Sequence, residues 1–418
     1  MSHARVGMVS HWYDPERGSA ALPGVIARSL VARGHTVDVL TGFPNYPSGT
    51  LYPGYRVRPY RRESSGGVTI HRAPLYPSHD ARPMHRAANF LSFAAAGALV
   101  APAALRAADA ALVFCSPATA AIPALSLRLL RRVPYVLHIQ DLWPDSVVSS
   151  GFVASSRVGR LERVLQAYCD VIYRHAHTIA VTSPGMAEAV AARGVPESRL
   201  AFVPNWADEA SFLPAAKDHE LAGELGLDAP FVVMYAGNFG EYQALDVLVE
   251  AATLLRSHTD IRFALVGSGV EETRLRRMVA ERDLANVTFV GPQPFGRMGA
   301  ILALGDVQVV SLQDRPLFRT TLPSKLQGVL AAGRPVVGAL VGDAAAVVRA
   351  SSAGLVVRPG SATELADAVL NLRTRGGEAL GRLGAAGRAY YEAEFSEAVA
   401  GGRLSELLDR AAGDRGRR

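Results

Sequence analysis

The stretch VGMVSHWYDPERGSAALPGVIARSLVARGHTVDVL, residues 6–40, determines the fold class of this chain. It begins with a short apolar run at 6–10 and ends with another at 37–40, and both runs are typical of buried strands. Between them, apolar side chains repeat at helical spacing, namely Leu22, Val25, Ile26 and Leu30. Gly34 then ends the helix. Strand, helix and strand in this order predict a βαβ unit of a parallel sheet with both faces covered.

The same alternation continues along the chain and then starts again. Further strand candidates lie at 111–115, 135–139 and 178–182, and a polar, proline-rich connector with a short helix follows at 199–230. A second set of strand candidates comes after it, at 231–237, 261–267, 287–291, 307–312, 335–340 and 354–357. We therefore predict an α/β protein with two doubly wound sheets joined near 204–210, with ligands bound beyond the carboxyl ends of the strands.

The composition is that of a globular protein, with 418 residues, 49% of them hydrophobic and 20% charged. The formal charge of +6 is scattered along the chain, which argues against a nucleic-acid partner and suits a phosphate-rich substrate or an anionic membrane surface. Cys115 and Cys169 make neither a disulfide framework nor a metal-binding spacing, and the amino terminus lacks an apolar signal segment. We therefore expect a location in the cytoplasm.

The longest apolar run, 90–105, contains Pro102 and is short for a membrane span. We expect a buried or surface-docked helix there, and a peripheral contact with the inner membrane face stays open. The basic run 56–63 is expected to be a solvated surface.

Two loops that follow strands in the first half carry candidate site residues. One contains Glu16 and Gly18 at the start of a helix, where backbone amides can receive a phosphate or a sugar hydroxyl, although an ordinary connection has the same pattern. The other, 41–56, is long and rich in Pro, Gly and Tyr, as functional loops often are. We assign its Asn45 and Tyr46 to the binding of an acceptor.

The segment HIQDLWPDS, 138–146, places polar side chains at the end of a central strand. His138 and Asp141 at this position predict a catalytic site, because strand ends of open sheets border the ligand. We assign Gln140 to the acceptor.

In the second half, VGSGVEE at 266–272 resembles a dinucleotide fingerprint, but Glu272 stands where the last glycine is required. A Rossmann oxidoreductase is therefore not indicated. The segment 291–298 can line a nucleobase with backbone groups. The segment DRPLFRTTLPSK, 314–325, brings cations to a helix start, namely Arg315, Arg319 and Lys325. Cations at a helix amino terminus predict a pyrophosphate site.

Six stretches in order resemble the retaining glycosyltransferases of family 4, which have the GT-B architecture: GHTVDVLTGFPNYPSG, HIQDLWPDS, VPNWADEASF, YAGNFGEYQALDVLVEA, LVGSGVE and LPSKLQGVLAAGRPVV. Within the family, the resemblance is greatest to the bacterial branch that attaches sugars such as N-acetylfucosamine in O-antigen and capsule assembly. It implies two Rossmann-like domains facing a central cleft, with an acceptor-binding domain at 1–204 and a nucleotide-sugar-binding domain at 205–384. It also implies carboxy-terminal helices at 385–418 that cross back to the first domain.

The resemblance further implies residue roles. The donor diphosphate would be held by Gly237, Asn238, Arg319, Ser324 and Lys325. The nucleoside would lie near Gly267, Gly269, Pro292 and Gln293. Glu16 and Gly18 would face the donor sugar and the acceptor, and Glu16 is the third residue that we predict to be catalytic, with His138 and Asp141. No metal and no cofactor is implied, because basic side chains and helix dipoles would stabilise the leaving diphosphate.

This chain departs from the family pattern at three places. The two glutamates of the usual Glu-x7-Glu motif are replaced by Thr320 and Gly328. The usual Arg/Lys pair after the first strand of the second domain is replaced by Glu241 and Gln243. The usual His-Asp before LWP is Gln140-Asp141, with His138 two residues earlier.

These observations predict a retaining glycosyltransferase that moves a sugar from a nucleoside-diphosphate sugar, with UDP preferred, to a hydroxyl-bearing acceptor. The acceptor is either a lipid-linked glycan or a small natural product. Two alternatives stay open: a nucleotide-sugar epimerase of GT-B fold, and a non-catalytic partner that binds sugar nucleotides.

Overall fold

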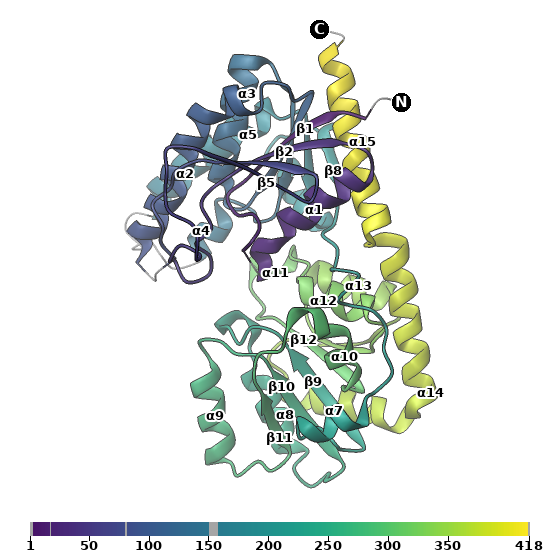
Figure 1. Cartoon of the computed structure of the whole chain (residues 1–418). Coiled ribbons are helices and arrows are strands. Elements are labelled where there is room, and N and C mark those ends of the chain that lie inside the picture. Colours follow the sequence, from purple (N-terminus) through teal and green to yellow (C-terminus); the bar gives the residue numbers. More distant parts are fainter. Residues whose placement is uncertain (1–2, 17, 80–81, 150–157, 417–418) are drawn as a thin grey trace. The chain divides into compact units, whose positions relative to one another are not determined.

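The computed structural model describes residues 3–16, 18–79, 82–149 and 158–416. The chain divides into two compact units. Unit 1 comprises Met1–Pro204 and Gly401–Arg418, and unit 2 comprises Asn205–Ala400 (Figure 1). The 384/385 boundary expected from the resemblance lies within the helical stretch Ala362–Glu394, whose backbone is non-helical at Gly376, and unit 2 continues to Ala400.

The sheet of unit 1 has the strand order β3-β4-β2-β1-β5-β6-β7-β8. The bounds are β1 Arg5–Ser10, β2 Thr36–Thr41, β3 Arg61–Ser65, β4 Val68–Arg72, β5 Ala110–Cys115, β6 Tyr135–Ile139, β7 Thr178–Val181 and β8 Leu200–Phe202. Neighbours pair in parallel except β3 and β4, which form an antiparallel hairpin. Val6 is in register with Val37 on one side and with Ala110 on the other, so β1 lies at the centre.

Every strand predicted in the first half is present, but β3, β4 and β8 were missed. The basic run at 56–63 enters β3, an edge strand whose residues are mostly exposed, which hides the alternation that marks a half-buried strand. β8 has only three residues at the start of the polar connector. The expectation of a purely parallel sheet is corrected by the β3–β4 hairpin.

Helices cover both faces of this sheet. The bounds are η1 Gly18–Ala21, α1 Leu22–Ala32, α2 Pro83–Ala104, η2 Ala118–Ala120, α3 Ala121–Arg131, α4 Asp145–Ser149, α5 Val158–His175, α6 Pro184–Ala191, η4 Glu197–Arg199 and α15 Glu397–Gly416. α2, α3 and α5 lie on one face, and α1 and α15 lie on the other (Figure 1). Phe93 of α2, Leu127 of α3 and Ile172 of α5 are buried in one core with Val113 of β5.

The predicted apolar run 90–105 falls in α2. Judged by length and composition alone, Met84–Ala104 is long and apolar enough to cross a membrane, and 33% of it is buried in the protein.

The sheet of unit 2 is parallel throughout, with the strand order β11-β10-β9-β12-β13-β14. The strands are β9 Phe231–Ala236, β10 Ile261–Val266, β11 Val287–Val290, β12 Val307–Ser311, β13 Val336–Ala339 and β14 Gly354–Val357, and all six were predicted. The helices are α7 His219–Glu224, η5 Glu241–Gln243, α8 Asp246–Leu254, α9 Glu272–Glu281, η6 Phe295–Arg297, α10 Met298–Ala303, α11 Pro316–Arg319, α12 Ser324–Ala331, α13 Gly342–Ala350 and α14 Ala362–Glu394.

The last helix is tied to unit 1 by polar contacts. His35 Nε2 lies 2.6 Å from Ser405 Oγ, and the Ala4 amide donates to Asp409. His177 contacts Asp414 one helical turn further on. These contacts attach the carboxy-terminal helix to the segments that directly precede β1, β2 and β7 of the same unit.

Candidate functional site

Lys325 has the least ordinary environment among the predicted donor residues. It lies in the first turn of α12, and its Nζ atom is buried with no hydrogen-bond partner among the residues that the structure describes. Burial lowers the pKa of this ammonium well below its usual value. The chain contains only two lysines against its many arginines. Arginine keeps its charge in any surroundings, whereas the charge of a buried lysine depends on its neighbours, so an anion bound beside Lys325 would favour its charged form.

The backbone at Gly237 makes room for this side chain. Gly237 has φ of 147°, and a Cβ built there would lie 2.9 Å from both Cε and Nζ of Lys325. Only glycine allows both the conformation and the approach. The predicted pair of Gly237 and Lys325 is therefore brought together within unit 2. Asn238 follows directly, and its carbonyl accepts a hydrogen bond from the Tyr235 hydroxyl at 2.8 Å.

Gly267 and Gly269 pack against the same loop. A Cβ on Gly267 would lie 2.1 Å from the Gly237 carbonyl oxygen, and a Cβ on Gly269 would lie 2.4 Å from that of Phe239. The Phe239 amide also donates to the Ser268 carbonyl. Close packing of two loops at neighbouring strand ends thus accounts for both glycines.

The other predicted donor residues are more exposed. Ser324 is exposed at the start of α12, and Pro292 is exposed after β11. Gln293 is half-buried and donates to the Gly291 carbonyl at 3.3 Å. Arg319 pairs with Asp314 at 3.1 Å, and Arg315 lies 3.7 Å from Glu241. Both arginines therefore have carboxylate partners, whereas the ammonium of Lys325 has none.

The structure explains one departure from the family pattern. A Cβ on Gly328 would lie 2.8 Å from Cε1 of Phe212, so the Phe212 ring occupies the space of a larger side chain. Thr320, at the other departure, donates its hydroxyl to the Leu317 carbonyl. The sequence showed that both glutamates are absent, but it gave no signal for the aromatic ring that covers one of the two positions.

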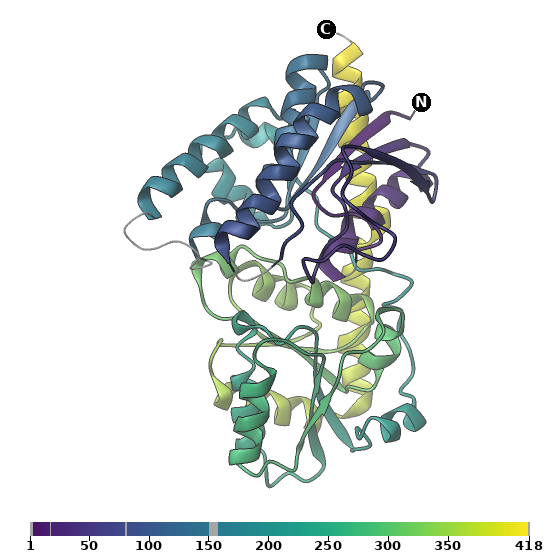
Figure 2. The same ribbon diagram turned by 60° about the vertical axis from the view of Figure 1, so that its left-hand side comes forward.

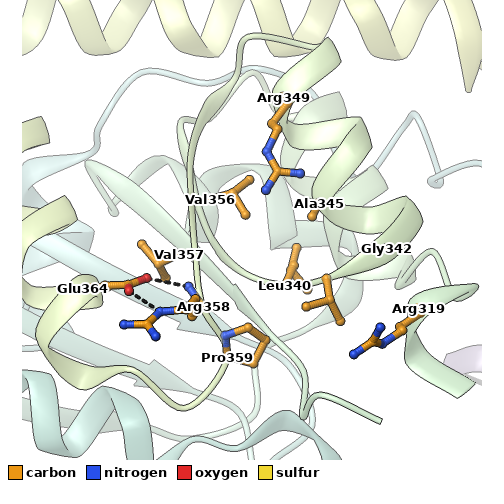
Figure 3. Close-up of a pocket in the computed structure, with 11 residues that line it drawn as sticks. Arg319, Leu340, Gly342, Ala345, Arg349, Val356, Val357, Arg358, Pro359 and Glu364 are labelled. Atoms are coloured by element: carbon orange, nitrogen blue, oxygen red, sulfur yellow. Dashed lines mark hydrogen bonds and ion pairs between the residues drawn. The ribbon is translucent and has the colours of Figure 1, made fainter. Parts of the chain in front are cut away.

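An open pocket of about 410 Å³ lies at the carboxyl ends of β13 and β14. Arg319, Arg349 and Arg358 line it, and Figure 3 shows the Arg349 side chain directed toward Val356. Arg358 is held by Glu364, and Arg319 by Asp314. Within the part of the chain that the structure describes, Arg349 makes no ion pair, so this pocket offers a positive charge to an anion.

In unit 1, Glu16 is buried, and both of its carboxylate oxygens accept hydrogen bonds from backbone amides. Its carboxylate accepts from the amides of Asn45 and Tyr46 at 2.8 Å each and from the Tyr13 amide at 3.1 Å. Burial raises the pKa of Glu16, and these three amide donors oppose that rise. The carboxylate thus joins the loop after β1 to the loop after β2. Gly18 is exposed with φ of 66°.

His138 is completely buried, and its Nε2 lies 3.0 Å from the Val203 carbonyl. Burial lowers its pKa to about 4, so the ring is neutral near pH 7. Asp141 is exposed, and Ser116 Oγ donates to its Oδ2 at 2.7 Å. Gln140 between them is half-buried. Of the three side chains predicted to be catalytic, Asp141 is the one at the surface.

Tyr46, which was predicted to bind the acceptor, belongs to an aromatic platform whose other members the sequence reasoning missed; we define the platform as Trp12, Tyr46, His79 and Phe90. Trp12 lies 5.4 Å from Tyr46 and 6.4 Å from Phe90 between ring centroids, and Tyr46 lies 4.8 Å from His79. All four rings are half-buried, so each keeps an open surface. Aromatic side chains that offer such surfaces suit the apolar face of a sugar ring or another hydrophobic group.

A buried polar pair lies next to the platform. His11 Nε2 is 2.8 Å from Asn89 Oδ1, and Asn89 donates to the Tyr76 carbonyl at 2.7 Å. The His11 ring makes edge contacts with Trp12 and Phe90. The sequence shows that His11 and Trp12 follow the first strand. Only the fold brings Asn89 and Phe90 of α2 beside His11.

One group of possible metal ligands occurs among the described residues, His3, His35 and Asp409, with ligand atoms within 4.8 Å of one another. Both ring nitrogens of His35 already have partners, Ala4 O for Nδ1 and Ser405 Oγ for Nε2. The group therefore serves to attach α15. The two cysteines, Cys115 and Cys169, are free and buried.

Comparison with known proteins agrees with this architecture. Residues 18–206 match the glycosyl transferase 4-like domain, and residues 230–375 match the glycosyl transferases group 1 domain. WcaI of Escherichia coli strain K12, provisionally named as a colanic acid biosynthesis glycosyl transferase, is 31% identical over 328 residues, which cover 77% of this chain and 79% of WcaI.

Two solved structures share the fold. Sucrose-phosphate synthase from Thermosynechococcus elongatus has a TM-score of 0.76 at 21% identity and covers 98% of this chain and 100% of its own. Anabaena HepE, solved in complex with UDP and glucose, has a TM-score of 0.70 at 16% identity. The match covers 97% of this chain and 100% of the HepE chain. With both domain types in order and a relative that matches most of its length, the chain belongs to the family 4 glycosyltransferases of GT-B fold.

Proposed function

We propose that this glycosyltransferase is retaining and metal-independent, and that it uses a nucleoside-diphosphate sugar in which the nucleotide is UDP. The observation that carries the proposal is Lys325, whose buried Nζ lacks a partner and lies against the glycine at the end of β9. A diphosphate would supply the missing counter-charge. The UDP and glucose bound in the Anabaena neighbour support UDP as the first nucleotide to test.

In this proposal, Lys325 stabilises the negative charge that builds up on the leaving diphosphate. The amides at the start of α12 assist, because a helix amino terminus carries partial positive charge. Because Gly237 has no Cβ, the backbone at this position can approach both Lys325 and the phosphates.

The acceptor would be bound by unit 1. Asp141 uses Oδ2 for Ser116, and its other oxygen remains available to orient an acceptor hydroxyl. The aromatic platform would bind the apolar side of the acceptor. Glu16 and His138 would contribute indirectly, by holding the loop after β2 and the segment at Val203 in place.

Calorimetry with UDP, GDP and dTDP, each with and without EDTA, tests the donor part. We expect UDP to bind in both conditions and the other nucleotides to bind more weakly. Loss of UDP binding in EDTA would contradict metal independence, and a preference for GDP would replace UDP as the nucleotide.

Incubation with UDP-sugars, followed by product analysis, tests the chemistry. Slow hydrolysis, and transfer with retained anomeric configuration once an acceptor is added, are expected. Binding without hydrolysis or transfer would indicate a non-catalytic partner, and conversion of the donor to its epimer without an acceptor would indicate an epimerase. Asp141→Asn should lower turnover more than UDP affinity, and wild-type turnover would remove Asp141 from the site.

A further inference from the structure

Helix α2 of unit 1 has an unusual exposed face. Among the positions of α2 whose burial the structure describes, those in the exposed class are all apolar: Met84, Ala87, Ala88, Leu91, Ala95, Leu99 and Ala103. The large members are strongly exposed, with 82% of Met84, 56% of Leu91 and 84% of Leu99 accessible. A helix on the surface of a soluble protein normally presents polar residues outward. From Met84 to Leu99 this apolar stripe runs for about 22 Å along the helix.

The stripe continues onto the neighbouring helix. α3 runs beside α2, with Ser126 Oγ donating to the Ala98 carbonyl at 2.8 Å and Arg131 Nε donating to the Pro102 carbonyl at 3.0 Å. Leu130 follows Ser126 by one helical turn on the same side and is 69% exposed. α2 lies on the outside of unit 1, in front of the sheet in Figure 2. We call the exposed apolar residues of α2 together with Leu130 the α2–α3 surface.

The charges around this surface have one sign. Between residues 82 and 132 the sequence contains six arginines and a single acidic residue: Arg82, Arg86, Arg106, Arg128, Arg131 and Arg132, against Asp109. Asp109 lies directly before β5, outside both helices, and its carboxylate accepts a hydrogen bond from the Arg5 amide. α2 and α3 themselves carry no carboxylate.

We propose that the α2–α3 surface docks unit 1 on an anionic lipid bilayer, with α2 lying in the plane of the interface. Apolar side chains bordered by arginines match the two layers that a bilayer presents, the acyl region and the negative headgroups. Two copies of this surface would bring like charges together, which disfavours self-association.

α2 lies on the bilayer and does not cross it. Its other face is part of the protein core, where Phe93 and Ala101 are buried against the sheet. Gly97 packs so closely on α3 that an added Cβ would lie 2.7 Å from Pro123. A spanning helix would have to give up these contacts and the Asn89 hydrogen bonds.

This surface also bears on the acceptor, a consequence that rests on the proposed function. Phe90 of the aromatic platform precedes Leu91 of the α2–α3 surface on the same helix. An acceptor bound at the platform would therefore lie at the edge of the bilayer. This placement suits a lipid-linked acceptor, whereas the binding of a small soluble acceptor does not require a nearby bilayer.

Vesicle flotation of the full chain, without substrate, tests the docking. We expect the protein to float with phosphatidylcholine vesicles that contain phosphatidylglycerol, to bind pure phosphatidylcholine weakly, and to be released by salt, because exposed charges are screened. Leu91→Gln with Leu99→Gln should weaken binding to the anionic vesicles by about tenfold or more, since two large apolar side chains no longer enter the interface. The matched control is Val270→Gln with Leu254→Gln in unit 2, where the side chains are 83% and 54% exposed, and this variant should float like the wild type.

Three results would overturn the proposal: no flotation with anionic vesicles, wild-type flotation of Leu91→Gln/Leu99→Gln, or a wild-type dimer in analytical ultracentrifugation that this variant dissociates. Because these side chains are exposed, the variant should keep its UDP affinity and its melting temperature. Flotation is measured without donor or acceptor, so failed docking and failed glycosyl transfer are separate outcomes.

Discussion

The ammonium nitrogen of Lys325 lies 2.9 Å from the centroid of the Tyr235 ring. In the free protein, the face of this aromatic ring is the neighbour that offers partial negative charge to the lysine. Such a contact compensates only part of the cost of burying an ammonium. This environment suits a stronger counter-ion, and the first three predictions concern Lys325 and Gly237.

The first prediction concerns nucleotide affinity. Lys325→Met should raise the UDP dissociation constant by roughly tenfold or more, because a charged hydrogen bond contributes about 1.5–3 kcal/mol. Lys217→Met is the matched control, since Lys217 is the other lysine and lies 3.4 Å from Asp306. Calorimetry on both variants measures the effect. Equal UDP affinities in the two variants would show that Lys325 does not contact the diphosphate.

The second prediction concerns stability and pH. Burial lowers the pKa of Lys325, so between this lowered pKa and the ordinary lysine pKa of 10.5 the unfolded chain binds more protons than the folded one. Stability of the ligand-free protein should therefore rise with pH across this window. Lys325→Met should be more stable than the wild type, and its advantage should shrink as pH rises. Urea titrations at several pH values measure this, and an advantage that grows with pH would contradict it.

The third prediction concerns Gly237. Gly237→Ala forces φ of 147° on a residue with a Cβ and places that Cβ 2.9 Å from Nζ of Lys325. We expect a loss of about 1–3 kcal/mol in stability from the strained backbone and a weaker affinity for UDP. Gly223→Ala is the control, because Gly223 lies outside the predicted donor residues and no atom lies within 4 Å of its added Cβ. Thermal denaturation and calorimetry compare the two, and similar behaviour of both variants would remove the steric argument.

The fourth prediction concerns the position that lost its glutamate. Gly328→Glu alone should destabilise unit 2, because the new side chain must displace the Phe212 ring. Adding Phe212→Ala should recover part of this loss, with a coupling free energy of about 0.5–3 kcal/mol between the two sites. A double-mutant cycle in urea gives the coupling. Additive effects would mean that Phe212 does not restrict this position.

The fifth prediction concerns acid stability of unit 1. The pKa of His138 falls from 6.5 to about 4 through burial, so the unfolded chain binds more protons between these values and stability is lost as pH falls through them. The loss from this residue approaches about 3 kcal/mol. His138→Gln, which retains a donor for the Val203 carbonyl, should flatten this part of the pH dependence. Fluorescence-monitored unfolding from pH 7 to pH 4 measures the free energy of unfolding of both proteins. If its slope against pH is the same in His138→Gln as in the wild type, His138 is in contact with solvent.

Much of the architecture was predictable from local pattern. The run 231–237 is continuously apolar because parallel strands are buried on both faces, and it was found as β9. β3 and β8 escaped because an exposed edge strand and a three-residue strand leave no periodic signal. The helix at 90–105 was expected, but its buried and exposed faces are both apolar, so the sequence could not tell which side met solvent.

For the candidate site, the sequence by itself determined which residue types stand at strand ends and helix starts, since these follow from chain order. Lys325 at the start of α12 and Gly237 after β9 belong to this class. Only the tertiary structure decided which of these side chains have partners. Among the described residues, Arg315 and Arg319 have carboxylate partners and Lys325 has none, and His138 is enclosed. Periodicity reports burial along one element, whereas pairing and accessibility depend on side chains that meet from distant elements.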